Sequence, residues 1–109
     1  MIEFNIAKEY SDIPGPRYIN EGEFSGEHFR KTILFPLVQK AQKEKSKIKI
    51  ILDGGYGYPT SFLEEAFGGI IRQTQDKSVC EIFEFKSDEE PALVPEIIQY
   101  MKEAADLLK

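Results

Sequence analysis

A chain of 109 residues with a formal net charge of −5 is long enough for one hydrophobic core, and its charge argues against general binding to nucleic acid. The hydrophobic fraction of 41% and the charged fraction of 30% are those of an ordinary globular domain, which excludes wholesale disorder. A single cysteine, Cys80, excludes an internal disulfide and a multi-cysteine metal site. Because no apolar stretch approaches the length of a membrane span and the first residues lack a secretory pattern, we expect a cytoplasmic protein without membrane contact.

Alternating apolar residues near the N-terminus predict a first strand. Ile2, Phe4 and Ile6 alternate with polar or small residues, which is the two-residue period of a half-buried strand. The Pro-Gly-Pro segment at residues 14–16 predicts a turn, and residues 17–20 are expected to form a short return strand.

The next segment predicts a helix that begins after Ser25, a residue type that caps helix N-termini. Pro36 lies inside this helix and, because it lacks an amide hydrogen, should kink the helix or mark a restart. The apolar positions that recur at helical spacing are Phe29, Ile33, Leu34, Leu37, Val38 and Ala41.

A strand, a helix and a further strand are expected in the middle of the chain. Residues 47–53 (KIKIILD) carry apolar side chains on both faces, which is typical of a parallel strand covered on both sides. Residues 61–73 have the apolar spacing of a second helix. Residues 78–85 (SVCEIFEF) again read as a strand that is apolar on both faces.

The C-terminal segment predicts a third helix with an apolar stripe that ends near Leu108. Ser87 and Glu90 stand three residues apart and match a capping box at its start, while Pro95 is expected within its first turns. The order of elements is strand, short strand, helix, strand, helix, strand, helix. It predicts a single α/β domain over residues 1–109, with about four strands in a mixed sheet packed against about three helices.

The loop that follows the middle strand is the main candidate for a functional site. Loops at the carboxyl ends of strands often bind ligands in α/β sheets. However, Gly54, Gly55 and Gly57 match neither the dinucleotide-binding nor the Walker pattern, and no lysine follows them. Binding of a small molecule or nucleotide by residues 54–61 stays an alternative, beside the simpler interpretation that the glycines supply backbone angles for a turn.

Catalysis has little support in the sequence. A serine nucleophile needs a base within hydrogen-bond reach, and the only histidine, His28, lies in another segment, where we expect it on the surface. No G-x-S-x-G elbow is present. Cys80 lies within an apolar run and is expected to be a small buried side chain without reactivity. We therefore expect a protein without enzymatic activity, catalytic residues, metal or cofactor.

The start of the second helix carries two hydroxyl groups. Ser61 and Glu64 match the S-x-x-E capping box, which would stabilise the helix. An exposed hydroxyl at this position, Ser61 or Thr60, is also a candidate for phosphorylation, because the helix dipole tolerates a phosphate there. Gly68 and Gly69 lie inside the same helix, and we favour close packing within the domain as their reason, with the end of the helix as the alternative.

A resemblance to a known family rests on these motifs. The strand end ILD (51–53), the glycine-bearing loop, TSF (60–62) and AFGGI (66–70) together resemble the STAS-like family of small bacterial domains. The segment GEHFRKTIL (26–34) is similar to the first helix of these domains, and the likeness runs from about Ser25 to Phe85. The family is related in fold to anti-sigma factor antagonists and to the cytoplasmic domains of sulfate transporters.

The resemblance implies a regulatory module that binds another protein. In the antagonists a partner kinase phosphorylates a serine at this position, which Ser61 or Thr60 would match, so the implied partner is a histidine-kinase-like ATPase or serine kinase. The antagonists have Asp-Ser-Ser-Gly where this chain has residues 59–62 (PTSF), which puts the phosphorylation in doubt. The residues expected to form the binding surface are Asp53, Gly54, Gly55, Tyr56, Gly57, Tyr58, Phe62, Glu64 and Glu65.

Overall fold

The computed structural model describes residues 1–108 and contains a parallel sheet of three strands. The strands lie in the order β1-β2-β3 and are β1 (Ile2–Asn5), β2 (Ile48–Ile51) and β3 (Phe83–Lys86). Phe4 pairs with Ile50, and Ile50 pairs with Phe85. The α/β class is confirmed, but the prediction of a mixed sheet with about four strands is wrong.

The missing strand is the predicted return strand at residues 17–20, which is a loop with one 3₁₀ turn, η1 (Ile19–Glu21). Its backbone groups form hydrogen bonds with residues of the same loop and of the start of the helix that follows it. The carbonyls of Pro16 and Arg17 accept hydrogen bonds from Gly26 and Glu27, and the Tyr18 amide donates to the Glu21 carboxylate. Because these groups are occupied, this segment does not pair with β1.

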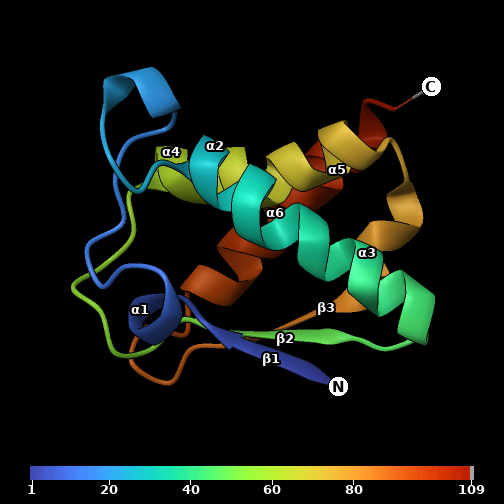
Figure 1. Ribbon diagram of the computed structural model, residues 1–109, viewed down its shortest axis with the longest axis horizontal. Coiled ribbons are helices and arrows are strands. Elements are labelled where there is room, and N and C mark those ends of the chain that lie inside the picture. The colour runs from blue at the N-terminus through green and yellow to red at the C-terminus, as the bar shows by residue number, and fades with distance from the viewer. Residues whose placement is uncertain (109) are drawn as a thin grey trace.

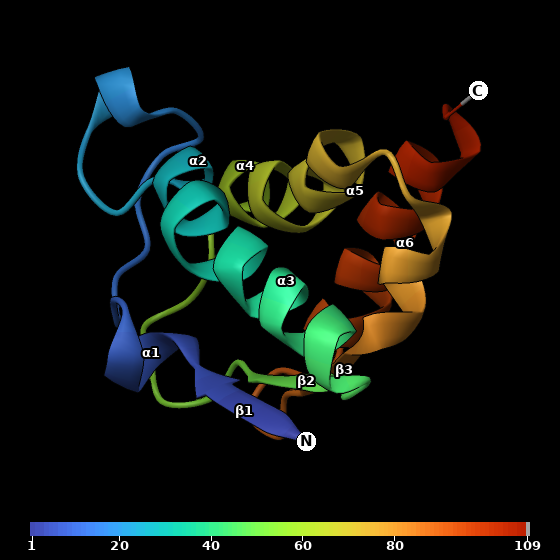
Figure 2. The same ribbon diagram turned by 45° about the vertical axis from the view of Figure 1, so that its right-hand side comes forward.

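Three long helical stretches pack on one face of the sheet (Figures 1 and 2). The first consists of α2 (Gly26–Phe29), a π-helical turn η2 (Arg30–Leu34) and α3 (Phe35–Glu44). The second consists of α4 (Thr60–Leu63), a π-helical turn η3 (Glu64–Gly68) and α5 (Gly69–Thr74). The third is α6 (Leu93–Asp106). Shorter helical segments that the sequence analysis did not predict are α1 (Ile6–Glu9) and η4 (Lys77–Ile82).

The first helix continues through Pro36 because a wider turn comes before it. The amide of Phe35 donates to the carbonyl of Arg30, five residues back, instead of four. A π turn of this kind changes the hydrogen-bond register at the point where proline can contribute no donor. A π turn within a continuous helical stretch therefore stands at the position where a kink or restart was predicted.

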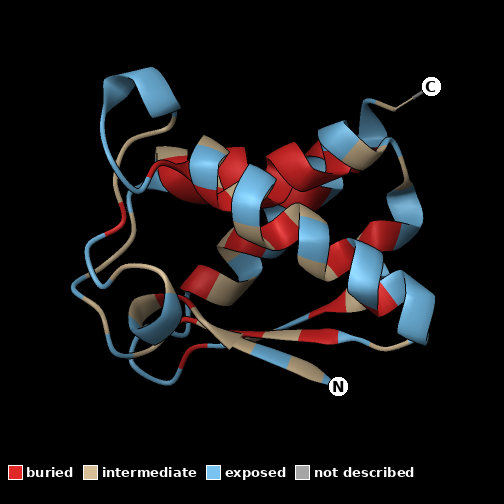
Figure 3. Cartoon of the chain, viewed as in Figure 1, coloured by how far each residue is buried: buried red, intermediate tan, exposed pale blue. Residues whose placement is uncertain are grey.

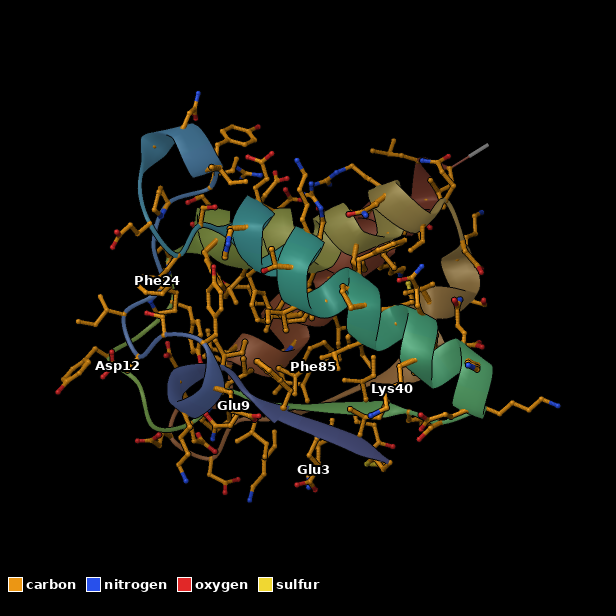
Figure 4. The ribbon with its side chains drawn as sticks, viewed as in Figure 1. Glu3, Glu9, Asp12, Phe24, Lys40 and Phe85 are labelled. Atoms are coloured by element: carbon orange, nitrogen blue, oxygen red, sulfur yellow. The ribbon has the colours of Figure 1, made fainter. Side chains whose placement is uncertain are left out.

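The two faces of the sheet differ. Ile48, Ile50 and Phe83 are buried against the helices, and Figure 3 shows buried residues both on the strands and on the helices that pack above them. In Figure 4, Phe85 points into the space between sheet and helices, whereas Glu3 points away from it. Within residues 1–108 no helix covers the face that carries Glu3 (Figures 1 and 2).

The prediction that β2 is covered on both sides is therefore wrong. Lys49 pairs in register with Glu3 on one neighbouring strand and Glu84 on the other, so the open face has a row of alternating charges. Ile51 lies on this same face and is only half-buried. An isolated apolar residue among charges is tolerated at such a surface.

The ends of several predicted elements differ for local reasons. The first strand stops at Asn5, whose side chain accepts a hydrogen bond from the Lys8 amide and caps α1. The strand predicted at residues 78–85 begins as η4, because the Asp76 carboxylate accepts from the Ser78 amide and starts a turn. The Ser87 hydroxyl donates to the Glu90 carbonyl, so the predicted capping box is absent and α6 begins at Leu93.

Candidate functional site

The loops that follow β1 and β2 lie together at one end of the sheet (Figure 1, left). The amide of Tyr56 donates to the carbonyl of Asp12 over 2.9 Å, which joins the two loops. The first loop is closed on itself, because the Gly15 amide donates to the Phe24 carbonyl over 2.9 Å. Figure 4 shows Asp12 and Phe24 at this same end of the molecule. Parallel strands always bring their carboxyl ends to one edge, so the sheet topology places these loops side by side.

Asp53, a predicted binding residue, connects the ends of β2 and β3. Its carboxylate accepts hydrogen bonds from the amides of Asp88 (3.1 Å) and Glu89 (2.9 Å), and these bonds lower its pKa. In return the amide of Gly54 donates to the Glu89 carboxylate. The oxygens of Asp53 are thus engaged within the protein, and its role here is to order the loop.

The glycines of the loop supply backbone geometry, as the simpler interpretation predicted. Gly54 and Gly57 have φ angles of 100° and 124°, values that strain any residue with a side chain. Gly55 has another reason: a Cβ atom there would lie 3.0 Å from the carbonyl oxygen of Asp12. Together they permit the turn and the contact between the loops.

The aromatic residues of the predicted surface point in different directions. Tyr56 is 83% exposed. The hydroxyl of Tyr58 donates to the Leu52 carbonyl over 2.9 Å, and burial raises its pKa to about 12. Phe62 was expected to belong to the binding surface but is completely buried, with its ring centroid 5.6 Å from that of Phe29. Phe62 therefore packs in the hydrophobic core beneath the second helix and does not belong to the binding surface.

The predicted capping box at Ser61 and Glu64 is wrong. The second helix begins at Thr60, with Pro59 as its N-cap, and no side chain caps it. Thr60 is exposed and Ser61 is half-buried. The prediction for the first helix is confirmed, because the Ser25 hydroxyl accepts a hydrogen bond from the His28 amide over 3.0 Å.

Glu64 and Glu65 do not extend the loop surface, because both bind arginines. Five residues, which we call the arginine–glutamate cluster, take part: Arg17, Arg30, Glu64, Glu65 and Arg72. Glu64 binds Arg17 over 2.7 Å and Arg72 over 2.8 Å. Glu65 binds Arg30 closely and Arg17 over 3.3 Å. Pairing with Arg72 and then Arg17 lowers the pKa of Glu64, although its partial burial acts in the opposite direction.

Sequence reasoning missed this cluster because its members come from three segments. Arg17 is in the loop after β1, Arg30 begins the first π turn, and the two glutamates begin the second. No local spacing links Arg17 to Glu64, which lies 47 residues away. The one sequence feature that pointed to close packing here was the glycine pair Gly68–Gly69. A Cβ on Gly69 would lie 2.7 Å from an Arg30 nitrogen, so the expectation of close packing within the domain is confirmed.

Five large apolar side chains on the joined loops are exposed, and of these the sequence analysis predicted only Tyr56. We call this group the loop-end patch, and it consists of Ile13 (65% exposed), Tyr18 (47%), Ile19 (48%), Phe24 (44%) and Tyr56 (83%). Beside it is a hollow of about 650 Å³, lined by residues 19–24 and His28. None of the lining residues belongs to the loop 54–61.

The two other residues that could be chemically reactive are a histidine and a cysteine. His28 is exposed, as expected, and its Nδ1 lies 2.8 Å from the hydroxyl of Tyr10. Cys80 is half-buried in η4, and burial raises the pKa of its thiol, which disfavours the reactive thiolate. No three metal-ligating side chains converge anywhere in residues 1–108. Over the same residues, no helix has the length and apolarity that crossing a membrane requires.

Comparison with known protein families places the chain in a family. The model of the STAS-like domain of unknown function (DUF4325) matches residues 25–92, a span that includes both π turns, the loop after β2 and the Gly68–Gly69 pair. No curated protein and no solved structure matches the chain significantly. Since the family model covers more than half of the 109 residues, the chain belongs to this family of STAS-like domains.

Proposed function

We propose that the protein is a non-catalytic regulatory module that binds another protein through the loop-end patch. The observation that carries this proposal is the exposure of five large apolar side chains on two loops that are joined by hydrogen bonds. A contiguous apolar surface is typical of sites that a partner covers, and the proposal requires that these side chains act together as one such site. Loops carried on a rigid sheet are also the usual place for binding residues.

The absence of catalysis in this proposal is supported by how the polar groups nearby are used. The oxygens of Asp53 accept backbone amides, and His28 contacts a tyrosine hydroxyl. Glu64 and Glu65 are paired with arginines. Each of these groups has a partner inside the protein that holds it in a structural role, and this supports the proposal of a module without catalysis.

Phosphorylation at the start of the second helix would give the module a switch. Of the two candidates, Thr60 is exposed and Ser61 is half-buried, so we favour Thr60 as the residue that a kinase reaches. A phosphate there would add about two negative charges beside the loop-end patch and alter its fit to a partner. The partner class that family resemblance favours is a histidine-kinase-like ATPase or serine kinase.

The test is a binding experiment on the intact chain with matched variants. Tagged wild-type protein expressed in its native cell is recovered with bound proteins, and intact-mass analysis reports any phosphate. Tyr56→Ser and Phe24→Ser should lose the same partner, whereas Glu84→Gln, on the open face of the sheet, should retain it. Equal retention by all three variants, with normal folding shown by circular dichroism, would refute the proposal.

A small-molecule function is the second candidate, and the hollow beside the loop-end patch favours it. Its volume of about 650 Å³ lies within the range of small-molecule sites, and its lining combines Ile19 and Phe24 with His28. Such a function predicts a saturable rise in melting temperature with a ligand of mixed apolar and polar character. A screen of nucleotides and metabolites without any such rise would eliminate it.

A further inference from the structure

A second hollow lies over the arginine–glutamate cluster, away from the residues that the proposed function uses. It has a volume of about 370 Å³ and is lined by Arg30, Lys31, Glu65, Gly69, Arg72 and Gln73. The lining comes from the first helix and the second helix, at the place where both contain a π turn. Single π turns inside helices are rare and often mark functional sites.

The charges around this hollow do not balance. The cluster has three guanidinium groups, those of Arg17, Arg30 and Arg72, but only two carboxylates, those of Glu64 and Glu65. The remaining cation that lines the hollow, Lys31, forms an ion pair with the carboxylate of Glu27 at a distance of 2.7 Å. One positive charge is therefore left over at this place, in a chain whose net charge is −5.

The two arginines that line the hollow are held in place by other contacts. Arg30 donates from Nε to the Gln73 side chain (2.9 Å), and from Nη1 to the carboxylate and the backbone carbonyl of Glu65. Arg72 binds the Glu64 carboxylate with both terminal nitrogens, over 2.8 and 3.0 Å. Gly69 allows the close approach, because a Cβ there would meet Arg30 at 2.7 Å.

These contacts leave hydrogen-bond donors free. A guanidinium group has five N–H donors. The bonds above use three donors of Arg30 and two of Arg72. Arginines that are already immobile lose little further entropy when they bind an anion, and their planar groups suit the oxygens of a phosphate.

We propose that this hollow binds a phosphate group, either free or as part of a small phosphorylated molecule. The free donors of Arg30 and Arg72 bind the phosphate oxygens, and the bound anion offsets the unbalanced charge of the cluster. Lys31, which is half exposed, contributes by exchanging its surface contact with Glu27 for one with the phosphate. The site is independent of the loop-end patch, so either proposal can fail without the other.

The test titrates the full-length chain with inorganic phosphate, and separately with phenyl phosphate, at constant ionic strength maintained with chloride. Melting temperature and the ³¹P NMR line width report binding. For wild-type protein we expect saturable binding of at least one ligand. Tighter binding of phenyl phosphate indicates a phosphorylated small molecule as the ligand, and equal binding indicates free phosphate.

The variants are Arg72→Gln, Lys31→Gln and, as a control, Lys40→Gln, whose exposed side chain lies on α3 and is not among the residues that line the hollow. We expect affinity to fall about tenfold or more for Arg72→Gln, to fall by a smaller factor for Lys31→Gln, and to stay unchanged for the control. If Arg72→Gln does not fold, Lys31→Gln alone decides. Absence of saturable binding, or equal affinity in wild type and Lys31→Gln, would overturn the proposal.

Discussion

Two regions of this molecule reverse the usual distribution of polar and apolar side chains. The arginine–glutamate cluster places charged groups between helices, where Glu65 is only 8% exposed. The loop-end patch places large apolar groups in water, where Tyr56 is 83% exposed. Charged residues are ordinarily outside and aromatic residues largely inside.

The difference between the two regions is one of internal partners. Every charged member of the cluster has at least one oppositely charged neighbour, so the cluster can be understood as part of the fold. The loop-end patch is ordered by backbone hydrogen bonds, and within it Phe24 packs against Tyr10 and Tyr18 lies under Arg17. Among residues 1–108, however, no oppositely charged or buried partner covers its exposed side chains. A change in the cluster should therefore alter stability, and a change in the patch should alter binding.

The largest effect is expected from Glu65→Ala. This change removes the carboxylate that Arg30 contacts and leaves that arginine, whose side chain is only 12% exposed, without its closest anionic partner. Breaking such a nearly buried pair should lower the free energy of unfolding by about 3 kcal/mol. Glu84→Ala, which removes a surface ion pair with Lys47, should change it by less than about 0.5 kcal/mol. Urea unfolding of both variants checks this, and equal losses would show that the cluster does not stabilise the fold.

The next effect concerns acid pH and Glu64. Because arginine pairing lowers the pKa of Glu64 below 4.5 in the folded protein, the unfolded chain binds the proton first as the pH falls. The stabilisation is thus complete above pH 4.5 and is lost as the pH falls through the lowered pKa. In urea unfolding at a series of pH values, the stability difference between wild type and Glu64→Gln should shrink in that window. Parallel curves would contradict the assignment.

A smaller effect separates Ser25 and Ser61, two of the three serines that were expected to cap helices. Ser25→Ala removes a cap that accepts the His28 amide, and should cost about 1 kcal/mol. Ser61→Ala should cost less than about 0.5 kcal/mol, because no side chain caps the second helix. Thermal unfolding of the two variants side by side makes the comparison, and the reverse order would show that Ser61 is the true cap.

The smallest effect on stability should come from Tyr56→Ser. The side chain is 83% exposed, so its loss should change the free energy of unfolding by less than about 0.5 kcal/mol. A large loss would place Tyr56 in the fold and would remove it from the loop-end patch. Chemical denaturation of this variant is therefore the control for any binding defect it shows.

How much the sequence could predict depends on the range of the interactions involved. The three long helices and strand β2 were predicted from the spacing of apolar residues, which depends only on residues close together in the sequence. Ser25 also behaves as expected, since its cap bond spans only three residues. Ser61 does not, because Arg17 and Arg72 bind the Glu64 side chain that would have completed its capping box.

The sheet and the candidate site were harder to predict for the same reason. Whether Lys49 faces a helix or water depends on which elements pack on the sheet, and nothing in KIKIILD specifies this. Phe62 sits in a loop-to-helix motif that indicated a surface, yet its ring packs against Phe29, 33 residues earlier in the chain. Tyr18, Ile19 and Phe24 lie in a polar segment without regular spacing, so their exposure together becomes evident only in the folded chain.

The most direct test of the central claim is an NMR titration of labelled protein with the partner recovered from the cell. The account predicts that amide shift changes gather at residues 12–24 and 54–60, around the loop-end patch. It also predicts little change at Glu3, Lys49 and Glu84, on the open face of the sheet. Shift changes confined to that open face, with residues 12–24 and 54–60 unaffected, would contradict the claim that the loop-end patch is the binding surface.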